Sequence, residues 1–116
     1  MRKKVYYLST CSTCKRIMQE LELGSEIEQQ DIKTQPMTPE QVDEMKVLAG
    51  SYEALFSNRS RQYRARGLHE VTLSEDELRA LILEDYTFLK RPVFLIGDQI
   101  FIGNANKTIA AVGAAL

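Results

Sequence analysis

Near the N-terminus the chain reads Val5-Tyr6-Tyr7-Leu8-Ser9-Thr10-Cys11-Ser12-Thr13-Cys14, and the expected fold can be built outward from this segment. The first four residues are β-branched, aromatic or aliphatic and end at a polar pair, which is typical of a short buried strand. Apolar residues then recur at helical spacing, at Cys14, Ile17, Met18 and Leu21, and predict an amphipathic helix that ends at Gly24. The two cysteines therefore lie where a strand passes into a helix.

Helix and turn signals predict the elements that follow. Thr38 and Gln41 form a capping-box pattern around Pro39, and Ser74 and Glu77 form a second one, so helices should begin at both places. The other expected elements are a strand over 26–32, a helix end at Gly50, a short helix over 52–56, a polar stretch over 58–68, a β-hairpin over 93–103 with a Gly97-Asp98 turn, and a last helix capped by Asn104.

This order of elements predicts the fold class. A strand, a crossover helix and a second strand form a parallel pair with a right-handed connection. Adding the hairpin gives an α/β protein with a mixed four-stranded sheet, which is the thioredoxin-like arrangement; a C-x-x-C motif beside such a unit indicates the same fold. We expect one domain over residues 1–116, with a helical insertion at about 38–90.

Composition limits the classes of function. The chain has 116 residues, 44% apolar and 27% charged, with a net charge of −1, so bulk attraction to nucleic acid or to a membrane surface is not expected. The apolar run Val5–Leu8 is too short for a secretory signal, and no run approaches the roughly 20 apolar residues of a membrane span. We therefore expect a cytoplasmic protein with reduced thiols, in which a C-x-x-C indicates redox or metal chemistry.

Cys11 is the predicted nucleophile. At or beside the N-cap of the helix it would face unpaired N–H groups and the positive end of the helix dipole, which favour the thiolate. Hydroxyls and positive charges nearby could add to this effect, from Thr10, Ser12, Thr13, Lys15 and Arg16. Cys14 lies one turn later on the apolar face, where a less acidic thiol suits a resolving role.

Other interpretations of these residues remain open. Buried cysteines are often inert. A structural zinc site needs four ligands, but the chain offers only Cys11, Cys14 and the single His69, so we predict no metal. Arg59, Arg61, Arg64 and Arg66 could form a basic patch for an anion, RNA or an acidic protein surface, or Arg61, Arg64 and Arg66 could simply be a solvated helix face.

Three segments together resemble the arsenate reductase (ArsC)/Spx family, over nearly the whole chain. These segments are Tyr7–Arg16, Asn58-Arg59-Ser60-Arg61 and Lys90-Arg91-Pro92-Val93. The resemblance implies a thioredoxin-like fold in which Cys11 attacks an oxyanion and Arg59 and Arg91 hold it. It also implies that Pro92 is the proline beside the active site, with a cis peptide bond. Guanidinium groups suit a tetrahedral oxyanion and would favour the Cys11 thiolate.

The resemblance implies two functions. The first is a thiol-dependent reductase without a bound cofactor, acting on a small oxyanion or a thiol/disulfide substrate and regenerated by glutathione/glutaredoxin or thioredoxin. The second is an Spx-like regulator that binds RNA polymerase and uses Cys11–Cys14 as a redox switch. The presence of Cys14 favours it, because the reductases that resolve with external glutathione generally lack a cysteine three residues after the nucleophile. The hairpin end at 100–104 carries no arginine where those reductases place a third one. A redox-inert interaction domain is a third hypothesis.

Overall fold

The computed structural model describes residues 2–116, which form two compact units. The first unit consists of the residues up to Gln35 together with Arg91–Leu116, and the second of Pro36–Lys90. The bounds of the second unit lie within a few residues of the insertion expected at about 38–90. That the whole chain is one domain stays a prediction.

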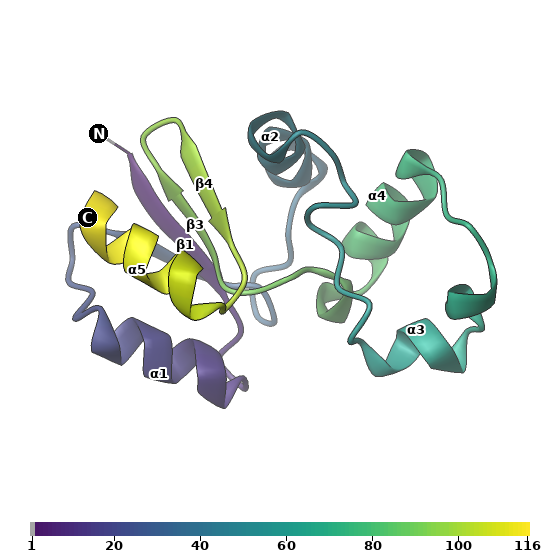
Figure 1. Ribbon diagram of the computed structural model, residues 1–116, viewed down its shortest axis with the longest axis horizontal. Coiled ribbons are helices and arrows are strands. Elements are labelled where there is room, and N and C mark those ends of the chain that lie inside the picture. The colour runs from purple at the N-terminus through teal and green to yellow at the C-terminus, as the bar shows by residue number, and fades with distance from the viewer. Residues whose placement is uncertain (1) are drawn as a thin grey trace. The chain divides into compact units, whose positions relative to one another are not determined.

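The first unit contains a mixed four-stranded sheet, as predicted (Figure 1). The strand order is β2-β1-β3-β4; β1 is parallel to β2 and antiparallel to β3, and β3 and β4 form the hairpin. The elements of this unit are β1 (Lys3–Tyr7), α1 (Ser12–Glu20), β2 (Glu28–Asp31), β3 (Val93–Ile96), β4 (Gln99–Ile102) and α5 (Asn106–Ala115).

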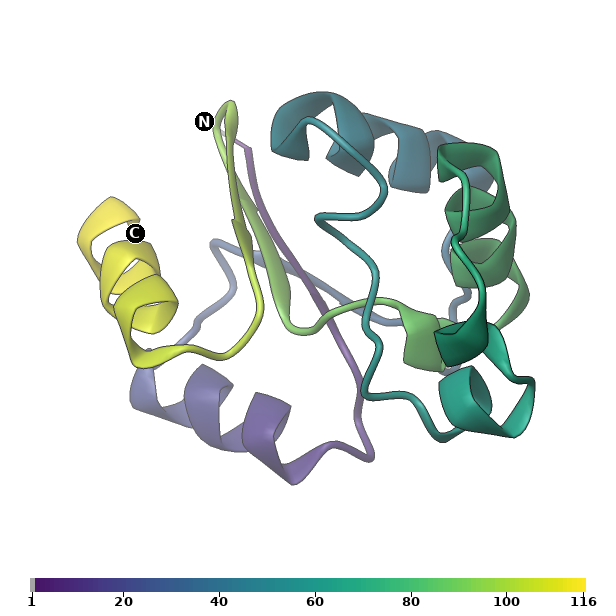
Figure 2. The ribbon, with the colours of Figure 1, turned by 45° about the vertical axis from the view of Figure 1, so that its right-hand side comes forward.

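Helices α1 and α5 cover the same face of this sheet (Figures 1 and 2). Val5, Phe94 and Ile96 point from the strands into a core that Ile17 of α1 and Val112 of α5 complete. All five side chains are at most 2% exposed. Each such burial stabilises the fold by about 1.5–3 kcal/mol. The core therefore fixes α1, and with it the cysteine motif at the N-terminus of α1, on the sheet.

The second unit is helical. It contains α2 (Pro39–Ala49), α3 (Arg61–Ala65), the 3₁₀ helix η1 (Leu68–Glu70), α4 (Glu75–Glu84) and the 3₁₀ helix η2 (Tyr86–Phe88). Both predicted capping boxes are confirmed: Thr38 and Gln41 exchange side-chain-to-backbone hydrogen bonds at the start of α2, and Ser74 and Glu77 do so at the start of α4. Gly50 ends α2 in a left-handed conformation with φ of 96°, also as predicted.

An ion pair joins α2 to α4. The Arg79 guanidinium donates from Nε and Nη2 to the two carboxylate oxygens of Asp43, at 2.7 and 3.1 Å, and the Tyr52 hydroxyl donates to Asp43 Oδ1 at 2.6 Å. The hydrogen bond from Arg79, followed by that from Tyr52, holds the pKa of Asp43 at about 2. A bidentate pair of this kind fixes orientation as well as distance.

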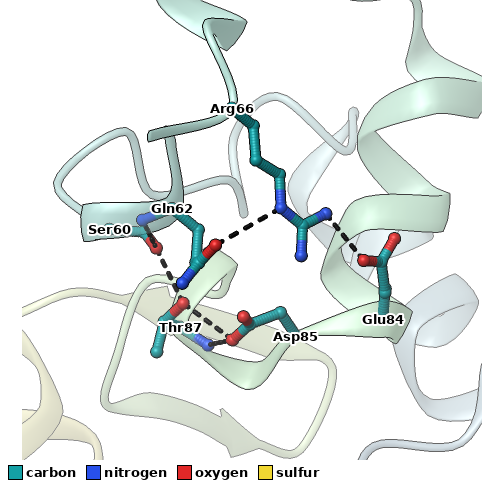
Figure 3. A network of polar contacts seen from close by, with 6 residues as sticks. All are labelled: Ser60, Gln62, Arg66, Glu84, Asp85 and Thr87. Atoms are coloured by element: carbon teal, nitrogen blue, oxygen red, sulfur yellow. Dashed lines mark hydrogen bonds and ion pairs between the residues drawn. The ribbon is translucent and has the colours of Figure 1, made fainter. Parts of the chain in front are cut away.

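A second polar network joins α3 to η2 (Figure 3). The hydroxyl of Thr87 donates to Asp85 Oδ1 at 2.7 Å, so the 2.7 Å bond between Ser60 and Thr87 must be donated by Ser60. Arg66, the C-cap residue of α3, forms a 2.6 Å ion pair with Glu84, the last residue of α4. Short α3 buries no residue of its own, so these polar contacts, together with the edge-on packing of the Tyr63 ring against Phe56, attach it to its unit.

The end of α1 differs from the prediction. The helix stops at Glu20, and Glu22, not Gly24, adopts the left-handed conformation, with φ of 52°. The amide of Leu23 donates to the carbonyl of Met18 and that of Glu22 to the carbonyl of Gln19. This pair of bonds is a Schellman motif, which needs a left-handed residue at the position of Glu22. A glycine signal two residues later was therefore misleading.

Three other predicted boundaries need correction. The strand expected over 26–32 covers only Glu28–Asp31. Residues 52–56 form turns instead of a helix, because the backbone there pairs with the segment before Arg91: Lys90 N–H donates to Leu55 and Ser57 N–H to Phe88. Asn104 does not cap α5; Ala105 occupies the N-cap position without a side-chain hydrogen bond.

Substituting Glu22→Gly should stabilise the protein by about 0.5–1 kcal/mol. A side chain in the left-handed region is strained, and glycine removes the strain. Urea unfolding of the wild type and the variant measures the difference. Gln19→Gly is the control: glycine at this exposed position within α1 should destabilise the protein by about 1 kcal/mol. If both variants were stabilised, or both destabilised, Glu22 could not be the helix-terminating residue.

Candidate active site

The turn between β1 and α1 positions both cysteines. The amide of Cys11 donates to the carbonyl of Leu8 at 3.0 Å, and the carbonyl of Cys11 accepts from the amide of Lys15 at 3.2 Å, the first bond of the helix. Cys11 is the N-cap of α1 in an extended conformation (φ −94°, ψ 111°), as the sequence predicted. Its side chain thus leaves the chain at the positive end of the helix.

The two thiols have different surroundings. Both are free, but Cys11 is half-buried whereas Cys14 is fully buried on the core side of α1. A substrate can therefore approach Cys11 directly, while Cys14 is screened from solvent. The difference is the one expected between a nucleophile and a resolving thiol.

The pKa of Cys11 is lowered from 9.0. Burial opposes the shift, but the backbone N–H and the thiol of Cys14, the charge of Arg91 and the N–H of Thr13 outweigh it. The N–H groups lie short of a complete capping hydrogen bond to Sγ, so they act chiefly as oriented dipoles on the thiolate. The hydroxyls and the charges of Lys15 and Arg16 considered from the sequence are not among the main causes of this shift.

The pKa of Cys14 is raised to about 11. Burial is the largest cause, and the hydrogen bond and the charge of the neighbouring Cys11 add to it, while the N–H of Leu8 and Arg91 oppose it. One sulfur is thus stabilised as a thiolate at the expense of the other. As the pH rises, the thiolate therefore forms on Cys11 before it forms on Cys14.

Arg91 and Pro92 belong to the same unit as the cysteines. Arg91 is half-buried, and its charge lowers the pKa of both thiols. The Arg91–Pro92 peptide bond is cis, and Pro92 is buried at the start of β3. Cys11, Cys14, Arg91 and Pro92 are therefore parts of one compact unit.

Arg59 belongs to the second unit, and its side chain is exposed. It precedes Ser60, which the network of Figure 3 ties to Thr87, and its own amide donates to Ser57 Oγ at 3.4 Å. Its anion-binding role stays a prediction from the family resemblance.

The remaining charged residues of that region have ordinary surroundings. Arg61 and Arg64 are exposed on α3, whereas Arg66 pairs with Glu84 and lies 5.6 Å above the ring of Phe88. His69 Nε2 lies 3.8 Å from its neighbour Glu70. All three arginines are exposed, and Arg66 in addition forms a structural contact with Glu84.

The second unit also contains an open cavity of about 390 Å³. Its lining includes Phe56, Tyr63 and Leu78 and the polar residues Asn58 and Lys90, but none of the site residues predicted from the sequence. Within residues 2–116, no three His, Cys, Asp or Glu side chains are grouped closely enough to hold a metal ion. Nor does any helix of that range have the length and apolarity of a membrane span.

Asp31 is a site residue that sequence reasoning missed. It ends β2, and its Oδ1 accepts a hydrogen bond from the amide of Ser9, in the turn that leads to Cys11. The sequence offered only an aspartate near the end of the strand expected over 26–32. Nothing in it indicated a contact across 22 positions of the chain.

A mixed sheet with a cysteine at the first helix N-terminus and a cis-proline before the hairpin defines a thioredoxin-like thiol protein. The sequence profile of the ArsC family matches residues 6–112, so the chain belongs to the ArsC family.

Individual relatives agree with this assignment. The uncharacterized protein YusI of Bacillus subtilis (strain 168) is 29% identical over 102 residues, which cover 84% of this chain and 86% of the relative. The solution structure of SACOL0876 from Staphylococcus aureus COL is also 29% identical, with a TM-score of 0.75, covering 94% of this chain and 96% of that one. An arsenate reductase from Vibrio cholerae has the same fold, with a TM-score of 0.79 at 18% identity, covering 100% of this chain and 98% of that one.

Alkylation of Cys11 by iodoacetamide should show a pH midpoint below 9.0, because the thiolate is the reacting species. Cys14→Ala should move this midpoint upward, since the variant removes the hydrogen bond from the Cys14 thiol to the Cys11 sulfur, which lowers the Cys11 pKa. Peptide mass spectrometry across a pH series measures both. Arg16→Ala is the control and should leave the midpoint in place. A wild-type midpoint at or above 9.0 would show that Cys11 is not activated.

Proposed function

We propose that this protein is a thiol-dependent reductase of the arsenate reductase type, with Cys11 as the nucleophile. The observation that carries the proposal is the contrast between the two sulfurs: Cys11 is half-buried at the N-cap of α1 and its pKa is lowered, whereas Cys14 is fully buried and its pKa is raised to about 11. Membership of the ArsC family supports the same chemistry.

The reaction on an oxyanion would take two steps. The Cys11 thiolate attacks arsenic(V) and forms a sulfur–arsenic bond as one oxygen leaves as water. The thiolate of Cys14, or of an external thiol, then attacks Cys11 Sγ; a disulfide forms, and arsenic leaves with the bonding electron pair as arsenite. Two thiols are oxidised as arsenic gains two electrons. Glutathione with glutaredoxin, or thioredoxin, returns the disulfide to thiols.

The same residues can act on a disulfide substrate. Cys11 attacks one sulfur and releases the other as a thiolate, leaving a mixed disulfide. Cys14 then attacks Cys11 Sγ and releases the second half of the substrate as a thiol. The substrate disulfide is reduced by two electrons, and the Cys11–Cys14 disulfide carries the oxidation.

The electrostatic coupling between the two sulfurs determines when the second step can occur. The thiolate of Cys11 is one of the groups that raise the pKa of Cys14. Once Cys11 is covalently bonded to substrate its charge is gone, so the pKa of Cys14 falls. The resolving thiol therefore becomes easier to deprotonate only after the intermediate has formed.

Arg91 is the proposed anion-binding residue of the cysteine unit, and the family resemblance adds Arg59. Because the hairpin end at 100–104 has no arginine, binding would rely on these two. A guanidinium can donate two parallel hydrogen bonds to an oxyanion and also favours the attacking thiolate.

A redox-switched regulator is the alternative, because a C-x-x-C with a buried second thiol also suits an internal disulfide used as a signal. In this case Cys11–Cys14 oxidation would alter binding to RNA polymerase, with no turnover. The same variants separate the two functions.

Cys11→Ser should abolish reduction of arsenate, and of a glutathione mixed disulfide, in assays with glutathione and glutaredoxin or with thioredoxin. Cys14→Ser should keep the first step but trap the Cys11 adduct, which intact-protein mass spectrometry detects as an added mass. Far-UV circular dichroism of both variants serves as the folding control. No turnover by the wild type with either substrate, together with polymerase binding that depends on redox state, would replace the enzyme by the regulator.

Arg91→Ala should raise KM for arsenate by about 10-fold or more and should raise the alkylation midpoint of Cys11. Both effects follow from loss of one charge-assisted contact and one nearby positive charge. Arg91→Lys should restore the alkylation midpoint of Cys11 better than KM for arsenate. Lysine keeps the positive charge but cannot donate two parallel hydrogen bonds to an oxyanion as a guanidinium does. Lys90→Ala removes the neighbouring charge and should change neither value; an equal effect from Lys90→Ala would refute a specific role for Arg91.

A further inference from the structure

The carboxylate of Asp31 connects the end of β2 to the turn that carries the nucleophile. Its Oδ1 accepts from the amide of Ser9 at 3.2 Å and from the amide of Lys33 at 3.1 Å. Asp31 is paired with Tyr7 at the last position of the β1–β2 ladder, and the amide of Ile32 donates to the carbonyl of Tyr7 at 2.9 Å. The carboxylate is therefore fixed by the sheet itself.

The residues held by Asp31 lie against both sulfurs. The carbonyl of Leu8 accepts from the amide of Cys11, and the N–H of Leu8 interacts with the sulfur of Cys14. Ser9 directly follows Leu8 and is two residues from Cys11. A shift of the Ser9 backbone would move the Leu8 peptide groups and with them the first turn of α1.

Asp31 remains an ionised acceptor in this position. Burial alone would raise its pKa, but hydrogen bonds from Ser9 and Lys33 lower it below 3.8. Hydrogen bonds to a carboxylate are roughly twice as strong as those between neutral groups. The contact with Ser9 is accordingly stronger than an ordinary turn hydrogen bond.

We propose that Asp31 is a positioning residue for Cys11: it holds the Ser9 amide so that the 8–11 turn keeps Cys11 Sγ at the N-terminus of α1. The inference rests on the proposed function only in taking Cys11 as the nucleophile. Asp31 itself touches no substrate.

Charge and position affect the pKa of Cys11 in opposite directions, which makes the proposal testable. Removing a negative charge near a thiol favours its thiolate and lowers the pKa. Loosening the turn moves the N–H groups away from the sulfur and raises the pKa of Cys11. Asp31→Asn removes the charge but keeps an oxygen acceptor, whereas Asp31→Ala removes both.

The experiment is the alkylation of Cys11 by iodoacetamide across a pH series, followed by peptide mass spectrometry. Asp31→Ala should raise the midpoint by about 0.3–0.7 pH units, and Asp31→Asn should leave it unchanged or slightly lower. Thr34→Val is the matched control: it removes the Thr34 hydroxyl, which bonds to the carbonyl of Asp31 at 3.4 Å and also interacts with its carboxylate, but it leaves the contact between Asp31 and Ser9 in place. The control should match the wild type.

Other outcomes would overturn the proposal. These are a folded Asp31→Ala with an unchanged or lowered midpoint, or equal shifts for Asp31→Ala and Thr34→Val. If Asp31→Ala does not fold, deuterium exchange at the Ser9 amide of Asp31→Asn decides, because a neutral acceptor binds more weakly and exchange should be faster. Unchanged exchange would reject the role of Asp31.

Turnover separates this inference from the proposed function. Alkylation requires neither substrate nor reductant, so a protein without reductase activity still gives a decisive midpoint. Where arsenate is reduced, Asp31→Ala should lower kcat by roughly 3- to 10-fold with little change in KM, since the nucleophile and not the anion contact is displaced. A change confined to KM would contradict a positioning role.

Discussion

The hydrogen bond from the amide of Cys11 to the carbonyl of Leu8 closes the turn on which the rest of the site depends. On one side of this turn lies β1, paired with β2 and β3 in the middle of the sheet; on the other lies α1, held by Ile17 in the core. Both anchors are buried and rigid, so the few residues between them have little freedom. A thiol can then be stabilised by N–H dipoles without a cost for ordering them at the moment of reaction.

This turn explains why two sulfurs three residues apart behave so differently. Cys11 precedes the helix and faces its N-terminal N–H groups, whereas Cys14 is inside the helix and faces the core. Burial dominates at Cys14 and raises its pKa to about 11, while at Cys11 the nearby N–H groups and Arg91 overcome burial. The same helix thus favours the thiolate at one cysteine and disfavours it at the other.

Much of this arrangement could be predicted from the sequence because its causes are local. The strand before Cys11, its N-cap position, both capping boxes and the Gly97-Asp98 turn depend on residues close together in the chain. The predictions were wrong where contacts between segments distant in the sequence determine the local structure. Residues 52–56 pair with 88–90 instead of forming a helix, and Asp31 contacts Ser9 across the sheet. The predicted end of α1 was wrong for another reason: Glu22 adopts the left-handed conformation for which a glycine was expected.

The division of the chain into two units separates the groups that set the acidity of Cys11 from Arg59. Cys11, Cys14, Arg91 and the groups that shift the thiol pKa values all belong to the first unit, which carries its own sheet and core. Arg59 belongs to the second, whose segment before Arg91 is fixed by backbone pairing with residues 55–57 and by the Ser60–Thr87–Asp85 network. We therefore expect substitutions over 36–90 to leave the acidity of Cys11 unchanged.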